Sequence, residues 1–427
     1  PAMDGTHTRD LLTRVLPDTF IETRAEEVGA VKRQRKVDIV TLVWTMILGW
    51  SSAATPSIAA LHRAYMWAAG HRIARSSFYE RLSDQMLALM KTCLEGLLQR
   101  AAKQTCAYHG QTLRDFKKVL AIDSTVVRLH RMLRSVYPGC SDGVASAKLD
   151  IVMNITDSSP QRLKIAEGRR SDQTFWRRMG SWVEGTLLLF DLGYYNFNFL
   201  RRIDLKGGRF LCRLKSDANP TIVANHLTTR GNAIDLEGKS LQDVLGRLKR
   251  KMLDVTVALT VKKQRYRGVQ STTTCYFRVV GRRNDETGDY HLYLTNIPVD
   301  VLEADDVAET YRLRWQLELL IKQLRSYTQL GAMPTSKESV AKMLIYASFM
   351  ALLLSREFLR EMRSRDPGGF YPPLRFQSVF ESFAQPILRA VTAHRRRGDM
   401  SIFECLTHEA RDPNLVRTRG RDILYRL

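Results

Sequence analysis

Residues 311–330 of the chain read YRLRWQLELLIKQLRSYTQL. The stretch has no Gly or Pro and is rich in Leu, Arg, Gln and Glu, so it predicts one long helix. At about 100° per residue, the leucines gather on one side, which we expect to be core. The opposite sector, roughly 80° wide, presents one carboxylate with an aromatic hydroxyl and three cations: Tyr311, Arg314, Glu318, Lys322 and Arg325.

This charged face has two interpretations. It fits a solvated surface held by i,i+4 ion pairs, such as Arg314–Glu318–Lys322. It also fits a phosphate-binding surface around a catalytic carboxylate. The rest of the chain favours the second interpretation, because it supplies two strand aspartates and a large excess of positive charge.

The composition limits the classes of function. A chain of 427 residues predicts two to four structural units. The formal net charge of +22 predicts a polyanionic partner, nucleic acid first and an anionic membrane surface second. We find no signal peptide and no apolar run near the roughly 20 residues of a membrane span. The six scattered cysteines and nine histidines form no CxxC or HxxxH pattern, so neither disulfides nor a zinc site are expected.

The N-terminal part, residues 1–110, is expected to be a helical DNA-binding domain. Gly70 separates two predicted helices, and the second begins with basic and hydroxyl residues. This order resembles a helix-turn-helix, in which Arg72 and Arg75 would contact DNA. Any helical bundle contains such turns, so the charge balance carries most of the argument.

Short β-branched runs alternate with helical segments after residue 111, which predicts an α/β fold with a mixed sheet and helices on its faces. Asp123 interrupts the first predicted strand, 118–127, and Asp191 directly follows the fourth, 187–190. The other predicted elements are strands 147–156, 161–167 and 209–214 and helices 171–185 and 198–205.

A β-rich insertion is expected at 216–297, with a helix at 241–251 and strands at 255–261, 272–280 and 290–297. It divides the predicted catalytic core into 111–215 and 298–365, the second part including an apolar helix at 336–363. The remainder, 366–427, is expected to be a helical region that contributes to dimerisation, with its helix at 374–395.

Three carboxylates, Asp123, Asp191 and Glu318, lie on elements that one α/β core can bring together. Oxygen ligands of this kind suit Mg²⁺ or Mn²⁺, and two such ions can activate a nucleophile and stabilise a leaving oxygen in phosphoryl transfer. An Asp inside an apolar strand is costly to bury unless a partner compensates its charge. The structural alternatives are a strand-end or capping Asp at 123 and an Asx turn at 191.

Together these motifs carry a resemblance to a known family. The strings IDST (122–125) and DLGYY (191–195), followed by Tyr311, Arg314 and Glu318 on a helix, resemble the DDE transposases of the insertion-sequence-four family. That family has a Tyr–Arg–Glu–Lys signature, in which Arg325 stands here for the Lys. The string EARDPN (409–414) also resembles the family.

The resemblance implies an RNase H-like catalytic core with Asp123, Asp191 and Glu318 as metal ligands, two Mg²⁺ or Mn²⁺ ions, and phosphate contacts from Tyr311, Arg314, Lys322 and Arg325. Family members that form a DNA hairpin often hold a flipped base with a Trp of the insertion. Residues 216–297 contain no Trp, so His291 or Tyr290 would take that place, with a plain strand position as the alternative.

The sequence therefore predicts a transposase that moves its element by cut-and-paste transposition through a hairpin intermediate. It would act on the inverted repeats of a transposon end and on target DNA as a homodimer in a synaptic complex, in the bacterial cytoplasm and without a membrane. Two alternatives remain: an RNase H-like nuclease without strand transfer, and a non-catalytic DNA-binding protein derived from a transposase.

Overall fold

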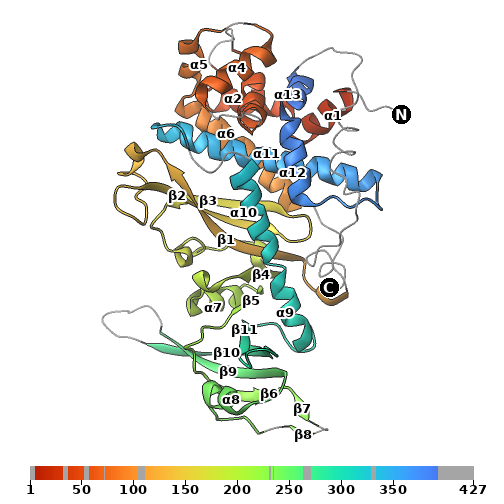
Figure 1. Ribbon diagram of the computed structural model, residues 1–427. Helices are drawn as coiled ribbons and strands as arrows, with labels where there is room; N and C mark the ends of the chain where they lie inside the picture. Colours follow the sequence, from red (N-terminus) through yellow and green to blue (C-terminus); the bar gives the residue numbers. More distant parts are fainter. Residues whose placement is uncertain are drawn as a thin grey trace.

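A computed structural model of the chain describes residues 5–31, 37–51, 57–71, 73–103, 111–229, 232–233, 235–262, 271–327 and 333–392. Figure 1 shows an elongated molecule in three tiers, with helices from both ends of the chain at the top, the first strands in the middle and the later strands below. The helix labelled α10 runs across the middle tier and reaches the upper one.

The middle tier is formed by five strands of one sheet, in the spatial order β3-β2-β1-β4-β5. β1 pairs antiparallel with β2 and parallel with β4, and β4 pairs parallel with β5. Their bounds are β1 (Lys118–Leu129), β2 (Ala145–Asn154), β3 (Ser159–Glu167), β4 (Thr186–Phe190) and β5 (Arg209–Arg213).

Alternate residues of these strands serve two separate cores, because successive strand side chains point to opposite faces of a sheet. On β4, Leu187 and Leu189 join the core beneath the upper helices, whereas Leu188 and Phe190 join the core beneath α7 (Phe197–Leu205). The sheet is therefore covered on both faces, which explains its nearly continuous apolar strands.

The lower tier continues the same sheet. β11 (Tyr290–Thr295) pairs antiparallel with β5, and β10 (Thr272–Arg283), β9 (Met252–Lys262) and β6 (Thr221–Asn225) follow, giving nine strands. A short pair, β7 (Thr228–Thr229) and β8 (Asn232–Ala233), and the helix α8 (Leu241–Arg247) complete this tier.

One buried ion pair fixes the lower tier to the chain that follows it. Arg278 on β10 donates two hydrogen bonds to the carboxylate of Asp254, at 2.8 and 2.6 Å, and one to the carbonyl of Leu302 at 2.7 Å. Both charged side chains are at most 5% exposed. Breaking such a pair leaves a buried charge without its partner.

We therefore expect Arg278→Met to lower the free energy of unfolding by about 3–5 kcal/mol, as measured by urea denaturation. The exposed pair Lys117–Glu184 is the control, since Lys117→Ala should cost at most about 1 kcal/mol. Replacing both Arg278 and Asp254 by apolar residues should restore part of the loss. A loss no larger than that of Lys117→Ala would contradict the assignment of this pair as a structural tie.

The upper tier combines helices from the two ends of the chain in one hydrophobic core. The long helix α11 packs against α6, and α1 packs against α13. The helices are α1 (Gly5–Val15), α2 (Asp18–Glu27), α3 (Ile39–Trp44) continued by a π-helical turn (Thr45–Gly49), α4 (Ile58–Ala69), α5 (Arg75–Arg81), α6 (Asp84–Lys103), α11 (Glu338–Arg365), α12 (Pro373–Ser382) and α13 (Ala384–Thr392).

The helix α11 is long and apolar enough to cross a membrane by length and composition alone. However, 78% of its apolar window is buried inside the protein. A buried helix of this kind is typical of a protein core, because its apolar surface is already covered by neighbouring helices.

Several predicted elements are confirmed, including the strand that contains Asp123 and the helix-ending Gly70, which has φ 70°. The predicted helix 171–185 is wrong. The segment instead forms two short 3₁₀ turns, η4 (Asp172–Thr174) and η5 (Ser181–Val183), because Trp176 turns inward to bond Asp150 and Gly180 is extended. The helix predicted at 241–251 ends at Arg247, since Leu248 leaves the helical conformation.

The long helix predicted at 311–330 is also corrected. It is divided into α9 (Ala304–Arg312) and α10 (Trp315–Tyr327), and its predicted end lies outside the described residues. Between the two helices, Leu313 and Arg314 donate to Thr310 and Tyr311 in bonds that span only three residues. The leucines at 313, 317, 320 and 324 are buried, as the periodicity predicts.

Candidate active site

The first candidate carboxylate, Asp123, lies in the middle of β1. Its residue pairs with Ile151 of β2, and β1 continues beyond it to Leu129. The amide of Ser124 donates to Asp123 Oδ1 at 2.8 Å. The side chain of Asp123 is 20% exposed, so it reaches the surface of the sheet only partly.

The second carboxylate, Asp191, follows β4 directly, next to β1 in the sheet. It caps a short 3₁₀ turn, η6 (Leu192–Tyr194), by accepting a hydrogen bond from the amide of Gly193 at 2.8 Å. A Cβ at Gly193 would lie 3.0 Å from Asp191 Oδ1, which is closer than most real contacts. The turn geometry therefore favours glycine here and is the Asx turn that the sequence offered as an alternative.

The third carboxylate, Glu318, lies in the first turn of α10 and is joined to Asp123 by a single arginine. Arg314 Nη2 donates to Glu318 Oε1 at 2.6 Å, and Arg314 Nη1 lies 3.6 Å from Asp123 Oδ2. The break between α9 and α10 places Arg314 at this position. The structure thus brings the charged face of the helix close to the strand that carries Asp123. Arg314, which the resemblance assigns to a phosphate, pairs here with two carboxylates.

The electrostatics of the three carboxylates are coupled. Burial, with a contribution from the negative charge of Asp191, raises the pKa of Asp123 to about 6. Burial lowers the pKa of Arg314, but Tyr311 and the two carboxylates raise it more. Because burial disfavours the ionised form of Asp123, a cation bound beside it would stabilise that form.

The donor set suits a hard divalent cation. Within the described ranges, no three His, Cys, Asp or Glu side chains lie close enough to hold one ion together. Mg²⁺ commonly takes only one or two protein carboxylates and completes its shell with water and phosphate oxygens. Asp123 on β1 and Asp191 directly after the neighbouring parallel strand β4 fit that preference.

Two of the predicted phosphate contacts lie further along α10. Lys322 is exposed and forms no ion pair in the part of the chain that the structure describes, so the ladder Arg314–Glu318–Lys322 is only half formed. Arg325 donates to the carbonyl of Val126 on β1 at 3.1 Å. With Arg128 it lines a recess of about 400 Å³ at the end of β1.

Tyr311 is only 8% exposed, unlike the surface hydroxyl that the sequence predicts. Its ring packs against Tyr293 with centroids 5.3 Å apart, and the guanidinium of Arg314 lies 5.7 Å from its centroid. The position at the C-terminal end of α9 explains this burial, since α9 packs on β9 and β10. The ring of Tyr311 therefore packs against the guanidinium of Arg314 and helps to hold it in place.

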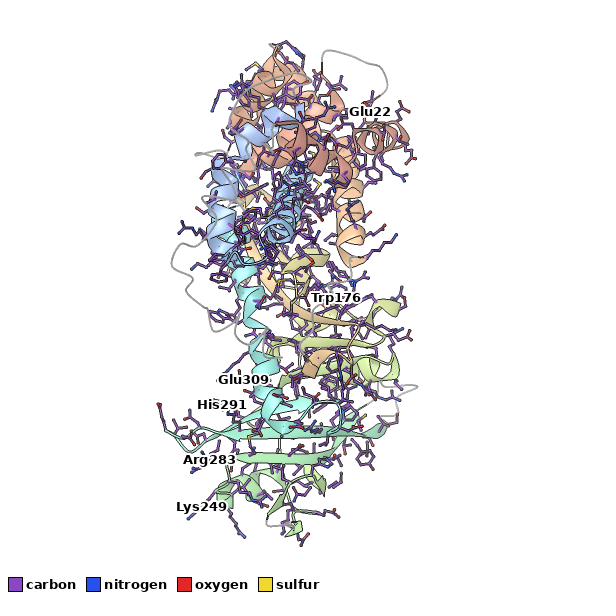
Figure 2. All side chains as sticks on the ribbon, turned by 90° about the vertical axis from the view of Figure 1, so that its right-hand side faces the viewer. Glu22, Trp176, Lys249, Arg283, His291 and Glu309 are labelled. Carbon is purple, nitrogen blue, oxygen red and sulfur yellow. The ribbon has the colours of Figure 1, made fainter. Side chains whose placement is uncertain are left out.

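The residues predicted for a flipped base lie on β11. Tyr290 donates its hydroxyl to the carbonyl of Arg250, and His291 is exposed and pairs with Arg282 across the strands. Figure 2 shows His291 near Glu309 and Arg283, in the part of the molecule below Trp176. Within the described ranges, neither side chain forms a hydrogen bond or an ion pair with the three carboxylates. Their role in holding a flipped base stays a prediction.

Of the N-terminal contacts, Arg75 begins α5 and is exposed, with its guanidinium 5.7 Å from the ring centroid of Tyr79. Arg72 lies outside the described residues. The turn between α4 and α5 exists, but these helices share their core with the C-terminal helices. DNA contact by this region stays a prediction.

The sequence interpretation missed a fourth carboxylate, Asp172. Its Oδ1 accepts from Ser124 Oγ at 2.8 Å and from Lys148 Nζ at 3.1 Å. Its Oδ2 would lie 3.2 Å from a Cβ at Gly193, so it faces the turn of Asp191. Asp172 thus touches the neighbours of both aspartates. The wrong helix prediction for 171–185 concealed it, since a helix would have directed this side chain elsewhere.

Beneath these turns, Asp150 on β2 is fully buried and accepts hydrogen bonds from Trp176 Nε1, at 2.5 Å, and from the hydroxyl of Tyr194. Burial raises the pKa of Asp150 to about 7. Trp176 follows η4 and Tyr194 ends η6, so one buried carboxyl group fixes both turns to the sheet.

Comparison with protein families gives a match to the family described as "Transposase DDE domain", over residues 114–354. The chain is 22% identical over 385 residues to the transposase for insertion sequence element IS231F of Bacillus thuringiensis subsp. israelensis, covering 82% of this chain and 80% of that protein. It is 24% identical over 355 residues to the transposase for IS1151 of Clostridium perfringens, covering 75% and 74%.

Among solved structures, the chain is similar to a cryo-EM structure of the piggyBac transposase synaptic complex with hairpin DNA. The identity is 9% and the TM-score is 0.45, with 98% of this chain and 88% of that chain covered. A superposition as loose as this carries no conclusion about the site.

Proposed function

The chain belongs to the family of transposases with a DDE domain, and from this premise we propose that it cuts DNA at the ends of an insertion sequence and joins the freed 3′ ends to new DNA. The observation that supports the proposal is that the charges of Asp191, directly after β4, and of Glu318, on α10, both act on Asp123 of β1. Arg314 bonds two of the three, so these elements meet at one place.

In the proposed mechanism, Asp123, Asp191 and Glu318 would hold the divalent ions, Mg²⁺ or Mn²⁺, most simply two. When bound, such ions polarise the scissile phosphate, lower the pKa of a water and stabilise the leaving 3′ oxygen. Arg314 must release Asp123 and Glu318 for these carboxylates to take up ions, and its freed guanidinium can then bond a phosphate. Asp172 orients Ser124, and through it the side chain of Asp123.

The cations of α10 are proposed to position the DNA. Lys322 and Arg325 follow Glu318 by one and two turns, and a helix rises about 5.4 Å per turn, so they reach phosphates beside the reacting one. Trp315 begins the helix and is 58% exposed, which offers a ring on which a base can stack. Tyr311 contributes by holding Arg314.

The finer assignment follows the resemblance to the insertion-sequence-four family. The order β3-β2-β1-β4-β5, with β4 and β5 parallel to β1, supports an RNase H-like core at 111–215 and 298–365. The strands β6 to β11 would be its insertion, 216–297. We also propose a helical N-terminal domain, 1–110, that binds the inverted repeats through Arg72 and Arg75, and a C-terminal region, 366–427, that contributes to a dimeric synaptic complex.

The proposed setting is the cytoplasm of a bacterium, where the net charge of +22 favours the nucleoid. A hairpin intermediate is part of the proposal, with His291 or Tyr290 near the displaced base. The chemistry at the carboxylates does not depend on that step.

The test is to incubate the full chain with duplexes of candidate terminal repeats in Mg²⁺ and to separate the products on denaturing gels. Cleavage followed by a joined or hairpin product supports a transposase. Cleavage without joining would leave a nuclease, and binding without cleavage would leave a DNA-binding protein.

We expect Arg325→Ala to slow cleavage by about 10- to 100-fold while weakening DNA binding less than tenfold. A phosphate misplaced by about 1 Å loses much of the rate, whereas many other cations share the binding. Arg325→Lys should keep most activity because the charge is preserved. Single-turnover cleavage and fluorescence anisotropy measure the two effects. If the cleavage rate and the DNA affinity fall by the same factor, Arg325 contributes only to DNA binding and not to the position of the reacting phosphate.

A further inference from the structure

A small recess of about 210 Å³ lies beside the two turns that carry Asp172 and Asp191. All of its lining residues carry polar side chains and none carries a carboxylate: Gln173, Thr174, Arg177, Asn196, Asn198 and Arg202. Gln173 follows Asp172 directly, accepts a hydrogen bond from the side-chain amide of Asn196 at 3.3 Å and donates one to the carbonyl of Tyr195 at 3.2 Å. These amides are already bonded, so the two guanidinium groups are the charged donors that the recess offers to an anion.

The two arginines lack acidic partners. None of the ion pairs within the described ranges involves Arg177 or Arg202. The pKa of Arg202 is lowered, first by burial and then by the like charge of Arg177. Its Nε is buried and has no hydrogen-bond acceptor. A protein that holds two guanidinium groups together without an acid has an unfavourable charge pair that an anion would relieve.

The backbone adds to this field. Arg202 lies on α7, whose N-terminal end, capped by Asn196, faces the recess. The dipole of a helix favours negative charge at that end. The helix alone would not make a site, but here its field adds to that of the two unpaired arginines.

From these observations we propose that the recess binds one backbone phosphate of DNA, close to the phosphate that reacts at Asp191. This inference rests on the proposed function and adds a second anchoring point to that of Arg325. The strand would be held by Arg177 and Arg202 in this recess and by Arg128 and Arg325 in the recess at the end of β1. The phosphate belongs either to the element end or to the target duplex.

The experiment combines protein and DNA changes. Each phosphate near the cleavage position is neutralised singly as a methylphosphonate, and affinity is measured for the parent and for Arg177→Ala/Arg202→Ala. For the parent, neutralisation at one position should weaken binding about tenfold. For the double variant, unmodified DNA should bind about tenfold more weakly, and the same position should no longer matter, because the two changes remove one interaction.

Separate scans of the element end and of the target duplex identify the source of the phosphate. Lys206→Ala, an exposed cation at the end of the same helix, is the matched control and should leave the whole profile unchanged. Arg177→Lys/Arg202→Lys keeps the charge and should retain part of the position-specific effect, which separates phosphate binding from loss of fold.

The inference is overturned if, in both duplexes, every methylphosphonate weakens binding of the double variant as much as it weakens binding of the parent. If the parent cleaves terminal repeats while the profile is unchanged, only this inference fails. If the parent neither cleaves nor prefers the terminal repeats, the proposed function itself fails.

Discussion

Replacing Asp123, Asp191 or Glu318 by alanine is expected to stop strand cleavage, with a loss of at least about a thousandfold in rate, while DNA affinity changes little. The carboxylates are proposed to hold the ions, and ion catalysis contributes several kcal/mol, each roughly 1.4 kcal/mol being tenfold. Affinity depends mainly on the cations, which remain. Single-turnover cleavage and anisotropy on the same duplex measure the two quantities.

The control is Asp142→Ala, which removes an exposed carboxylate on the loop between β1 and β2. It should cleave like the parent. A near-parental rate for any one of the three alanine variants would remove that residue from the catalytic set. Because Arg314 pairs with both Asp123 and Glu318, thermal melting should accompany each variant to show that the fold persists.

Removal of divalent cations should have an effect of similar size. In EDTA we expect no cleavage, and Mg²⁺ or Mn²⁺ should restore it. Ca²⁺ should support assembly on DNA but little chemistry, since its larger and looser coordination shell positions reacting oxygens poorly. Full activity in EDTA would exclude metal-ion catalysis.

The same ions should stabilise the protein in a pH-dependent manner. The pKa of Asp123 is raised to about 6, so the folded state prefers the protonated carboxyl, and stability is lost as the pH rises from the ordinary value of 3.8 through 6. A bound cation offsets that loss. Mn²⁺ should therefore raise the melting temperature more at pH 7.5 than at pH 5, where protons compete. Asp123→Asn should remove this difference.

The sequence predicted the strands of the middle tier well, because short β-branched apolar runs and the positions of Asp123 and Asp191 within or after them are local features. The position of Asp191 after four apolar residues was enough to place it at the end of β4. The turn at Gly193 could likewise be predicted, since an Asx turn depends on neighbouring residues only.

The arrangement around Arg314 could not be predicted, because it depends on contacts distant in the chain. Helical periodicity predicted a continuous helix through Leu313, whereas the hydrogen bonds there join residues three apart instead of four and divide it. Nothing local indicates that Arg314 reaches Asp123, almost two hundred residues earlier. The wrong helix prediction for 171–185 concealed Asp172 and Arg177, and their neighbours from other turns could not be predicted from local sequence.

The shared core of the upper tier has a consequence for synthesis of the chain. The helices α1, α3, α4 and α6 pack against α11 or α13 in one shared core, so residues 5–103 have no complete core until α13 leaves the ribosome. Asp123 and Asp191 are made long before Glu318. A nascent chain therefore carries two of the three carboxylates but neither the third nor a finished helical tier. The proposed cutting of DNA would therefore have to wait until α10 to α13 have been made.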